Sequence, residues 1–197
     1  MLPELLFIVL LLLSYLIGSI STAIIVCKMF NLPDSRTQGS NNPGATNVLR
    51  IGGKKAAAIT LIGDGLKGAI PVLIAHYLAF NMLNVTWVIL VTFLGHVYPI
   101  FFSFKGGKGV ATFLGALLAL SYLTGLSFII TWVFVAKVLK ISSLSALIST
   151  VLTPVYFYLI TNNLASTYVI ILICLWIFYT HQSNIKRLLN SQENKIN

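Results

Sequence analysis

Long apolar stretches, separated by short polar segments, make up most of this chain. The first, 5–27, is 23 residues without a charge, and about 20 apolar residues are enough for a helix to cross the hydrocarbon core of a bilayer. The stretches 56–104 and 141–185 are each long enough for two such helices. The stretch 109–136 has only 28 residues, so as a hairpin each arm would rise about 21 Å and both helices would be short. The pattern predicts an all-α, polytopic membrane protein with about seven transmembrane helices.

Composition supports this prediction. Of the 197 residues, 57% are hydrophobic and 9% are charged, whereas a soluble domain has about 25% charged residues. These values exclude a soluble globular protein, a coiled coil and a disordered chain. We expect 5–27 to be retained rather than cleaved as a signal peptide, because no basic region precedes it and no small-residue cleavage site ends it. Cys27 and Cys174 lie inside apolar runs, so we expect buried packing residues rather than a disulfide or a metal site.

The cations predict the topology. Lysine and arginine outnumber acidic residues by 13 to 4. Twelve of the cations fall into four groups, which are Lys28, Arg36, Arg50, Lys54 and Lys55; Lys105 and Lys108; Lys137 and Lys140; and Lys186, Arg187 and Lys195. The turns between the groups, 81–84, 121–125 and 161–163, are polar but uncharged. Because basic loops stay in the cytoplasm, we expect the amino terminus outside, the carboxyl terminus in the cytoplasm and every basic group on the cytoplasmic face.

Such a face has two interpretations. It is either an orientation signal that also attracts anionic lipid, or part of a site for an anionic ligand. The loop 28–55 favours the second, because 39–47 reads Gly-Ser-Asn-Asn-Pro-Gly-Ala-Thr-Asn and is followed by Arg50. Such residues turn tightly, expose backbone N–H groups and add hydroxyl and amide donors, and arginine has a planar fork suited to phosphate. An ordinary surface loop is the alternative.

A second polar loop, 103–109, precedes an apolar helix. Its 105–109 segment reads Lys-Gly-Gly-Lys-Gly, and glycines before a helix let backbone amides approach an anion, aided by the helix dipole and Lys108. The spacing is not that of a Walker A loop. The segment is therefore interpreted as a phosphate-binding loop at the membrane boundary, and a turn that merely breaks the helix is the alternative.

Two further pairs of polar residues are spaced three apart, so each pair shares a helix face. Asp64 and Lys67 lie inside a predicted span, where ionisable groups are costly and mark a polar cavity or pair with each other; we favour a structural pair. His181 and Asn184 follow the last span.

The sequence has no Gly-x-Ser-x-Gly elbow and no His-Glu-x-x-His motif, so an enzyme built on it would work by positioning and charge stabilisation.

At these residues the chain resembles the bacterial acyl-phosphate:glycerol-3-phosphate acyltransferases (PlsY). The resemblance lies in three motifs, which are Gly39-Ser40…Asn42…Gly44-Ala-Thr-Asn47…Arg50; Gly95-His96…Pro99 with 104–112; and His181…Asn184-Ile-Lys-Arg-Leu-Leu189. Asp64…Lys67-Gly68 and the serine stretch 142–145 also fit. The match follows the family order over nearly the whole chain. Departures are small: Asn41 and Pro43 stand at variable positions, and Tyr98 stands where Phe is usual.

The resemblance implies a seven-helix enzyme that moves an acyl chain from acyl phosphate to the 1-hydroxyl of glycerol 3-phosphate. The products would be lysophosphatidate and phosphate, in the first membrane step of phospholipid synthesis. It implies no cofactor and no metal, membrane lipid as surroundings, and an enzyme upstream that forms acyl phosphate with a lysophosphatidate acyltransferase downstream. It places the protein in the bacterial inner membrane as a multi-pass protein with a cytoplasmic active site. No nucleic-acid partner is expected.

Positions carried over from the family give the candidate site. The catalytic candidates are Ser40, Arg50, Lys108, His181 and Asn184. The candidates for binding substrate or phosphate are Asn42, Gly44, Thr46, Asn47, His96, Lys105, Gly106, Gly107, Gly109 and Ser143. Arg50, Lys108 and the amides of 106–109 would hold phosphates, while Ser40, Ser143, His181 and Asn184 would position glycerol 3-phosphate. Another serine of the stretch 142–145 is the alternative to Ser143. The proton acceptor is either the substrate phosphate or His181.

A transporter for a phosphorylated metabolite is the main alternative function. Transporters place ionisable residues near the bilayer midplane, often in repeated halves. Here only Asp64 and Lys67 fall within a predicted span, and no internal repeat is visible. A scaffold that binds anionic lipid would account for the cations but not for the loops rich in glycine, asparagine and serine. The motifs therefore favour the acyltransferase.

Overall fold

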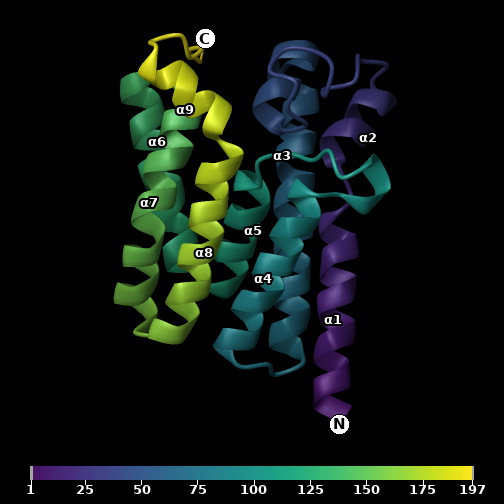
Figure 1. The fold of residues 1–197 in the computed structure, drawn as a ribbon, viewed down its shortest axis with the longest axis vertical. Helices are drawn as coiled ribbons and strands as arrows, with labels where there is room; N and C mark the ends of the chain where they lie inside the picture. Colours follow the sequence, from purple (N-terminus) through teal and green to yellow (C-terminus); the bar gives the residue numbers. More distant parts are fainter. Residues whose placement is uncertain (1, 197) are drawn as a thin grey trace.

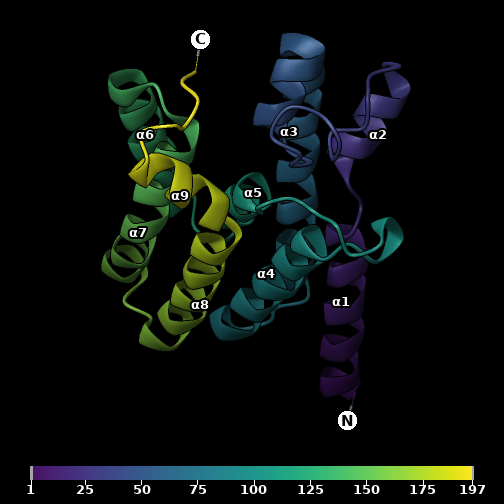
Figure 2. The ribbon, with the colours of Figure 1, turned by 45° about the horizontal axis from the view of Figure 1, so that its top comes forward.

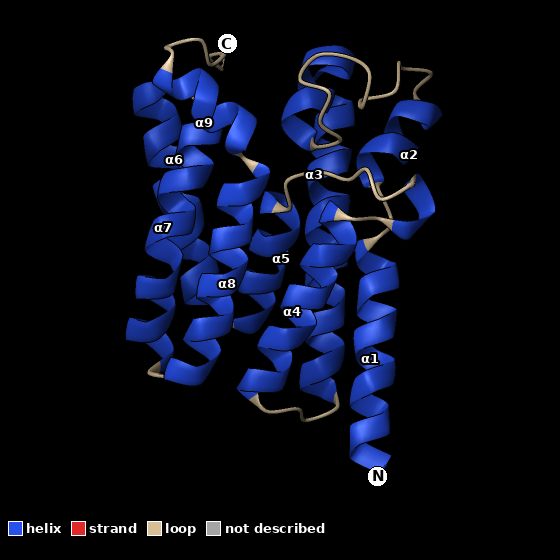
Figure 3. Ribbon diagram, viewed as in Figure 1, coloured by secondary structure: helices blue, strands red, loops and turns tan. Residues whose placement is uncertain are grey.

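Helices and loops account for the whole of residues 2–196, which a computed structural model describes (Figure 3). The α-helices are α1 (Leu2–Gly18), α2 (Thr22–Met29), α3 (Ala45–Tyr77), α4 (Met82–Val97), α5 (Val110–Leu120), α6 (Tyr122–Leu139), α7 (Ser142–Thr161), α8 (Leu164–Thr180) and α9 (Gln182–Leu189). A short 3₁₀ helix, η1 (Ile100–Phe102), follows α4. The predicted all-α class is confirmed.

The helices form two groups with α5 between them (Figure 1). On one side α1 packs against α4, and α3 contacts α1, α2 and α4. On the other side α7 packs against both α6 and α8, and α9 follows α8. The central helix α5 contacts α3, α4 and α6. Figure 2 shows the same division after rotation, with α9 turned away from the direction of α8.

The surface of the bundle is suited to lipid. Leu12, Leu73, Ile130, Leu159 and Leu175 are all more than half exposed, an arrangement costly in water and favourable against hydrocarbon chains. Within residues 2–196, five helices or helix pairs are long and apolar enough to span a membrane, and the bent pair α8 and α9 would make six. The remaining apolar helix, α5, has 11 residues. Within the described residues these segments follow the predicted order, and α5 falls short of a full span.

The sequence predicts one span over 5–27. In the structure this span is not one continuous helix, since it breaks between α1 and α2. The break leaves backbone groups without their usual partners within a membrane-spanning segment. The buried Lys67 ammonium of α3 donates a hydrogen bond to the carbonyl of Ile20 at 2.6 Å. The same ammonium lies 3.0 Å from the Asp64 carboxylate. Lys67 thus forms the expected pair with Asp64 and also stabilises the broken segment.

The helix α3 begins much earlier than the apolar pattern indicated. It starts at Ala45 rather than near 56, so Thr46, Asn47 and Arg50 lie on a helix instead of in the predicted loop 28–55. Hydropathy does not indicate this helix, because the stretch from 45 to 55 is polar. Gly53, with φ 77° and ψ −176°, bends the helix between this polar start and the apolar remainder.

The predicted short hairpin over 109–136 is half right. The helix α5 is short, but α6 has 18 residues and runs to Leu139, so Lys137 lies in a helix rather than in a loop.

Glycines let α5 approach α3 closely, because a Cβ atom on Gly68 would collide with the carbonyl of Thr112, and one on Gly115 with the carbonyl of Gly65. Small residues are the usual means of close helix packing in membranes. Cys27 and Cys174 are buried and unpaired, as predicted.

Candidate active site

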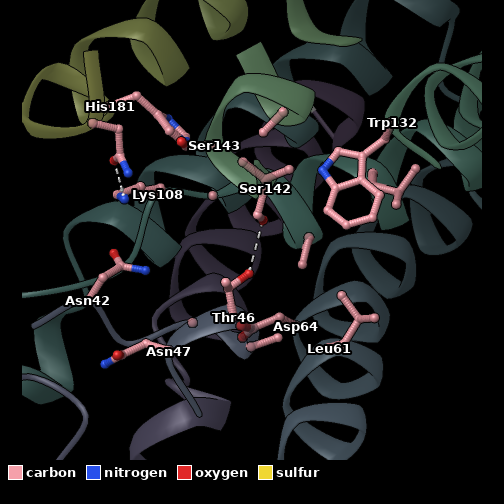
Figure 4. A pocket seen from close by; sticks show the side chains of 18 of the residues that line it. Asn42, Thr46, Asn47, Leu61, Asp64, Lys108, Trp132, Ser142, Ser143 and His181 are labelled. Atoms are coloured by element: carbon pink, nitrogen blue, oxygen red, sulfur yellow. Dashed lines mark hydrogen bonds between the residues drawn. The ribbon is translucent and has the colours of Figure 1, made fainter. Parts of the chain in front are cut away.

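A pocket of about 350 Å³ opens where the two helix groups meet (Figure 4). Its wall combines the loop before α3, the first turns of α3, the start of α5, the start of α7 and the junction of α8 with α9. These segments are far apart in the sequence, and all three motifs contribute to the wall. The two polar loops therefore meet at one pocket, as the sequence predicts.

Most candidate residues line this pocket. They are Ser40, Asn42, Gly44, Thr46, Asn47, Arg50, Asp64, His96, Lys108, Gly109, Ser143, His181 and Asn184. Lys105, Gly106 and Gly107, predicted to bind phosphate, are absent from the wall, and Lys105 is exposed on the loop surface. Apolar residues and the carboxyl-terminal tail complete the lining without having been predicted.

The first motif is held together by Asn47. Its side-chain oxygen accepts a hydrogen bond from the backbone N–H of Ser40 at 2.8 Å. Its amide nitrogen donates to the carbonyls of Ser35 and Gln38 at 2.8 and 2.9 Å. Asn47 is buried and its amide group is fully engaged, so its observed contacts fold the loop and place Ser40 at the pocket.

The second motif differs from the expected cradle of amides. The N–H of Gly106 donates to the carbonyl of Val97 at 3.2 Å, and that of Gly107 donates to the carbonyl of His96 at 3.3 Å. These two amides are therefore used to fasten the loop to the end of α4. Lys108 is the residue of this loop whose charge reaches the pocket.

Lys108 belongs to a chain of polar contacts with the carboxyl-terminal tail. Its ammonium donates to the side-chain oxygen of Asn184. The amide nitrogen of Asn184 donates to Glu193 at 2.5 Å, and the hydroxyl of Ser143 donates to the same carboxylate oxygen at 2.8 Å. Arg187 donates to the other oxygen at 2.6 Å. Glu193 thus fixes two predicted site residues from a position that sequence reasoning missed.

The pKa values in this network follow from burial and charge. Burial lowers the pKa of Lys108 to about 8; the charge of Glu193 opposes this shift, and Arg187 and Arg50 reinforce it. Burial alone would raise the pKa of Glu193, but the hydrogen bonds from Ser143, Asn184 and Arg187 lower it overall. The carboxylate is therefore ionised at neutral pH, and Lys108 keeps most of its charge there.

His181 has a defined orientation. Its Nδ1 lies 2.8 Å from the carbonyl oxygen of Ile177, and because a carbonyl can only accept, Nδ1 carries the proton. In the neutral ring Nε2 then has the free lone pair and can accept a hydrogen bond from a hydroxyl. The side chain is buried at the pocket wall, and Figure 4 shows it beside Ser143 and near Lys108.

His96 supports the pocket from behind the second loop. Its Nδ1 lies 3.1 Å from the hydroxyl of Thr112 and 3.7 Å from the carboxylate of Asp64, and it is almost fully buried. A Cβ atom on Gly107 would collide with this ring. Asp64 and His96 are therefore packed beneath the loop that carries Lys108. Among the described residues, no group of three or more His, Cys, Asp or Glu side chains is arranged to hold a metal ion.

One part of the pocket wall is apolar. It consists of Leu61, Leu114, Phe128, Ile129, Trp132 and Val133, from α3, α5 and α6. Leu61 and Val133 are also partly exposed. The pocket thus joins a cationic region to an apolar region within the membrane-spanning helices, which fits a ligand that carries both an anionic group and a hydrocarbon chain.

Known proteins provide the decisive comparison. Residues 8–191 match the family model described as Glycerol-3-phosphate acyltransferase. The chain belongs to the glycerol-3-phosphate acyltransferase family. It is 51% identical to the glycerol-3-phosphate acyltransferase of Thioalkalivibrio sulfidiphilus, over 93% of this chain and 90% of that protein. It is 53% identical to the enzyme of the same name from Hydrogenovibrio crunogenus, over 93% of this chain and 88% of that protein.

Solved structures agree with this assignment. The fold is similar to that of PlsY, an integral membrane glycerol 3-phosphate acyltransferase, in its glycerol 3-phosphate form, with a TM-score of 0.92, 36% identity and coverage of 97% of this chain and 96% of that chain. For the lysophosphatidic acid form of PlsY the TM-score is 0.89 at 35% identity, with coverage of 97% and 95%. The resemblance to the PlsY family is confirmed, and the chain is an integral membrane protein.

The Glu193 network gives a testable prediction for this family member. Changing Glu193 to Gln removes the charge opposite Arg187, and hydrogen bonds to charged groups contribute about 1.5–3 kcal/mol each. We expect a thermal midpoint lower by about 3–8 °C and a loss of activity as Asn184 and Ser143 lose their fixed positions. Because the pKa of Glu193 is lowered in the fold, its contribution to stability is present above the usual glutamate pKa and is lost as the pH falls.

Thermal unfolding and activity in detergent, as a function of pH, would check this prediction. Asp34→Asn is the matched control, since the Asp34 carboxylate pairs with Arg36 at 2.7 Å on the loop surface and outside the pocket wall. Equal destabilisation by both variants would show that the tail carboxylate has no special importance.

Proposed function

We propose that the protein transfers a fatty acyl group from acyl phosphate to the 1-hydroxyl of glycerol 3-phosphate, releasing lysophosphatidate and phosphate. The observation that carries this proposal is the union of Arg50 and Lys108 with an apolar wall in one pocket. Both substrates have a phosphate for the cations, and the donor has a chain for the apolar wall. The family assignment supports the acceptor, since relatives are named for glycerol 3-phosphate.

The proposed reaction has one displacement. The 1-hydroxyl oxygen of glycerol 3-phosphate attacks the acyl carbonyl carbon and forms the ester C–O bond. The C–O bond to phosphate breaks, its electron pair leaves with the phosphate, and the hydroxyl proton is taken up either by that phosphate or by His181. Arg50 and Lys108 stabilise the leaving group through charge-assisted hydrogen bonds. Ser40, Ser143, His181 and Asn184 hold the acceptor with its hydroxyl near the carbonyl carbon.

The location follows from charge. The basic segments lie toward the end of the bundle opposite the amino terminus (Figure 1). With basic loops in the cytoplasm, the pocket opens on the cytoplasmic side of the bacterial inner membrane. We propose seven membrane helices with the amino terminus outside, α5 being a short one at a place where the protein thins the bilayer. Its neighbours in metabolism would be an enzyme that forms acyl phosphate and one that acylates lysophosphatidate.

A direct assay tests the proposed function. The purified protein is given acyl phosphate and glycerol 3-phosphate, and lysophosphatidate is measured, with acyl-CoA as the control donor. We expect product from acyl phosphate only. No product from acyl phosphate would refute the reaction, and product only from acyl-CoA would assign the protein to a different kind of acyltransferase.

The pKa of Lys108 predicts the pH dependence of this reaction. Because deprotonation removes a phosphate-binding charge, kcat/KM should fall as the pH rises through about 8, since kcat/KM reports the free enzyme. In Lys108→Arg, which stays charged, this alkaline limb should disappear from a profile measured between about pH 6 and 10. A wild-type profile that is flat across that range would contradict the assignment.

The same profile distinguishes the two proton acceptors. If the substrate phosphate accepts the proton, His181→Gln lowers the rate but leaves the shape of the profile unchanged. If His181 is the base, the variant loses a titrating limb.

A further inference from the structure

A pair of hydroxyl groups joins the two halves of the pocket. The hydroxyl of Thr46, on the first turn of α3, lies 3.3 Å from that of Ser142, the first residue of α7. In the view of Figure 4 this hydrogen bond lies between Lys108 with His181 on one side and Leu61 with Trp132 on the other. The pair therefore stands where the cationic and apolar regions of the pocket meet.

That junction corresponds to one atom group of an acyl phosphate. Such a molecule consists of a phosphate, then a carbonyl, then a hydrocarbon chain. If the phosphate contacts Lys108 and Arg50 and the chain lies along Trp132, the carbonyl falls between them. During acyl transfer the carbonyl oxygen gains negative charge, so donors aimed at it lower the barrier.

The hydroxyl pair can supply such a donor. Two hydroxyls joined by one hydrogen bond use one of their two protons, and the other proton remains available. The 3.3 Å separation is long for an O–H···O contact, whose usual length is about 2.7–2.8 Å, so the pair can open around a third oxygen. The neighbouring Ser143 is less suited to this role because its hydroxyl donates to Glu193 at 2.8 Å.

We propose that the hydroxyls of Thr46 and Ser142 bind the carbonyl oxygen of the acyl donor and stabilise the charge that develops on it. The proposal rests on the proposed function, and adds to it a site for the one part of the donor that the cations and the apolar wall leave unassigned. Both hydroxyls stand on helix turns, and helices hold such groups more accurately than loops do.

Substitutions test the pair, with a matched control in the same chain. Thr46→Val and Ser142→Ala remove one hydroxyl each, and the double variant combines both changes. Thr46→Ser keeps a hydroxyl at position 46. The control is Thr131→Val, because the Thr131 hydroxyl lies 3.0 Å from that of Tyr156 and links α6 to α7 outside the pocket wall. Each variant is compared with the wild-type enzyme by thermal unfolding, kcat, and KM for both substrates.

We expect kcat of the double variant to fall about 10- to 100-fold, less than the 10²–10³-fold loss seen for one donor of a closed oxyanion hole, because Thr46 is exposed. The KM for glycerol 3-phosphate should change little in the double variant. Thr46→Ser should retain most of the wild-type kcat, and Thr131→Val should have the wild-type rate.

An alkyl phosphate of the same chain length provides a second measurement, since it has the phosphate and the chain but no carbonyl. Its inhibition constant should be the same for the wild-type enzyme and the double variant. Weaker inhibition in proportion to the loss of kcat/KM would overturn the proposal, because the pair would then hold the phosphate or the chain. Wild-type kcat in the double variant would also overturn it. A wild-type enzyme without acyl transfer would refute the proposed function itself, which the variants alone do not do.

Discussion

Lys108→Met should lower kcat/KM of acyl transfer by about 10²–10³-fold, the loss typical of removing one charged or preorganised donor from a transition state. Lys108 is a cation of the pocket wall, and its ammonium is held by Asn184. Methionine preserves much of the side-chain volume but supplies no charge for a phosphate. Initial rates with both substrates varied, together with thermal unfolding, would measure the effect.

Lys105→Met is the matched control because it removes the same charge from the same loop. Lys105 is exposed and outside the pocket wall, so we expect less than about a threefold change, an effect of surface charge on the encounter with anionic substrates. If both variants lost activity equally, the loop would act by general attraction of anions and not by contact in the pocket.

Arg50→Lys should be the next most damaging change, with kcat lowered about 10²-fold although the formal charge is kept. An ammonium is a point charge and cannot form the two parallel hydrogen bonds of a guanidinium to phosphate. Arg50 projects from the start of α3 into the pocket wall, where that fork would meet the leaving phosphate. Steady-state kinetics at saturating concentrations of both substrates would measure the loss.

Arg36→Lys is the corresponding control, since Arg36 pairs with Asp34 on the surface of the same polar segment and does not line the pocket. We expect it to retain the wild-type rate. Near-normal turnover in Arg50→Lys would show that Arg50 serves only as a topology signal or a lipid anchor.

The sequence predicted those parts of the fold that depend on composition and spacing. Apolar stretches and cation groups indicate the membrane helices in their order, and the length of 109–136 indicates a short helix, found as α5. The start of α3 could not be obtained in this way. Thr46, Asn47 and Arg50 of this segment line a pocket, so the start of the helix carries polar side chains, and hydropathy does not distinguish a polar helix from a loop.

Within the site, the motifs predicted most of the lining but not the state of each polar group. The amides of Gly106 and Gly107 are used by backbone carbonyls, which no local pattern reveals. Glu193 enters the site because the chain after α9 folds back toward Ser143, and that return depends on tertiary contacts. The Thr46–Ser142 pair likewise joins residues 96 positions apart. A single sequence contains no local pattern that indicates such long-range contacts.

The contact between Lys67 and Ile20 has a consequence for biogenesis. The carbonyl of Ile20, at the break of the first span, has its hydrogen-bond donor, Lys67, 47 residues later in the chain. Inserting that lysine into hydrocarbon without a partner is costly. Each segment therefore relieves a defect of the other, so the translocon should release them into the bilayer as a couple rather than one by one. A ribosome-stalled nascent chain that ends before Lys67 is expected to leave its first segment loosely inserted and extractable by alkali.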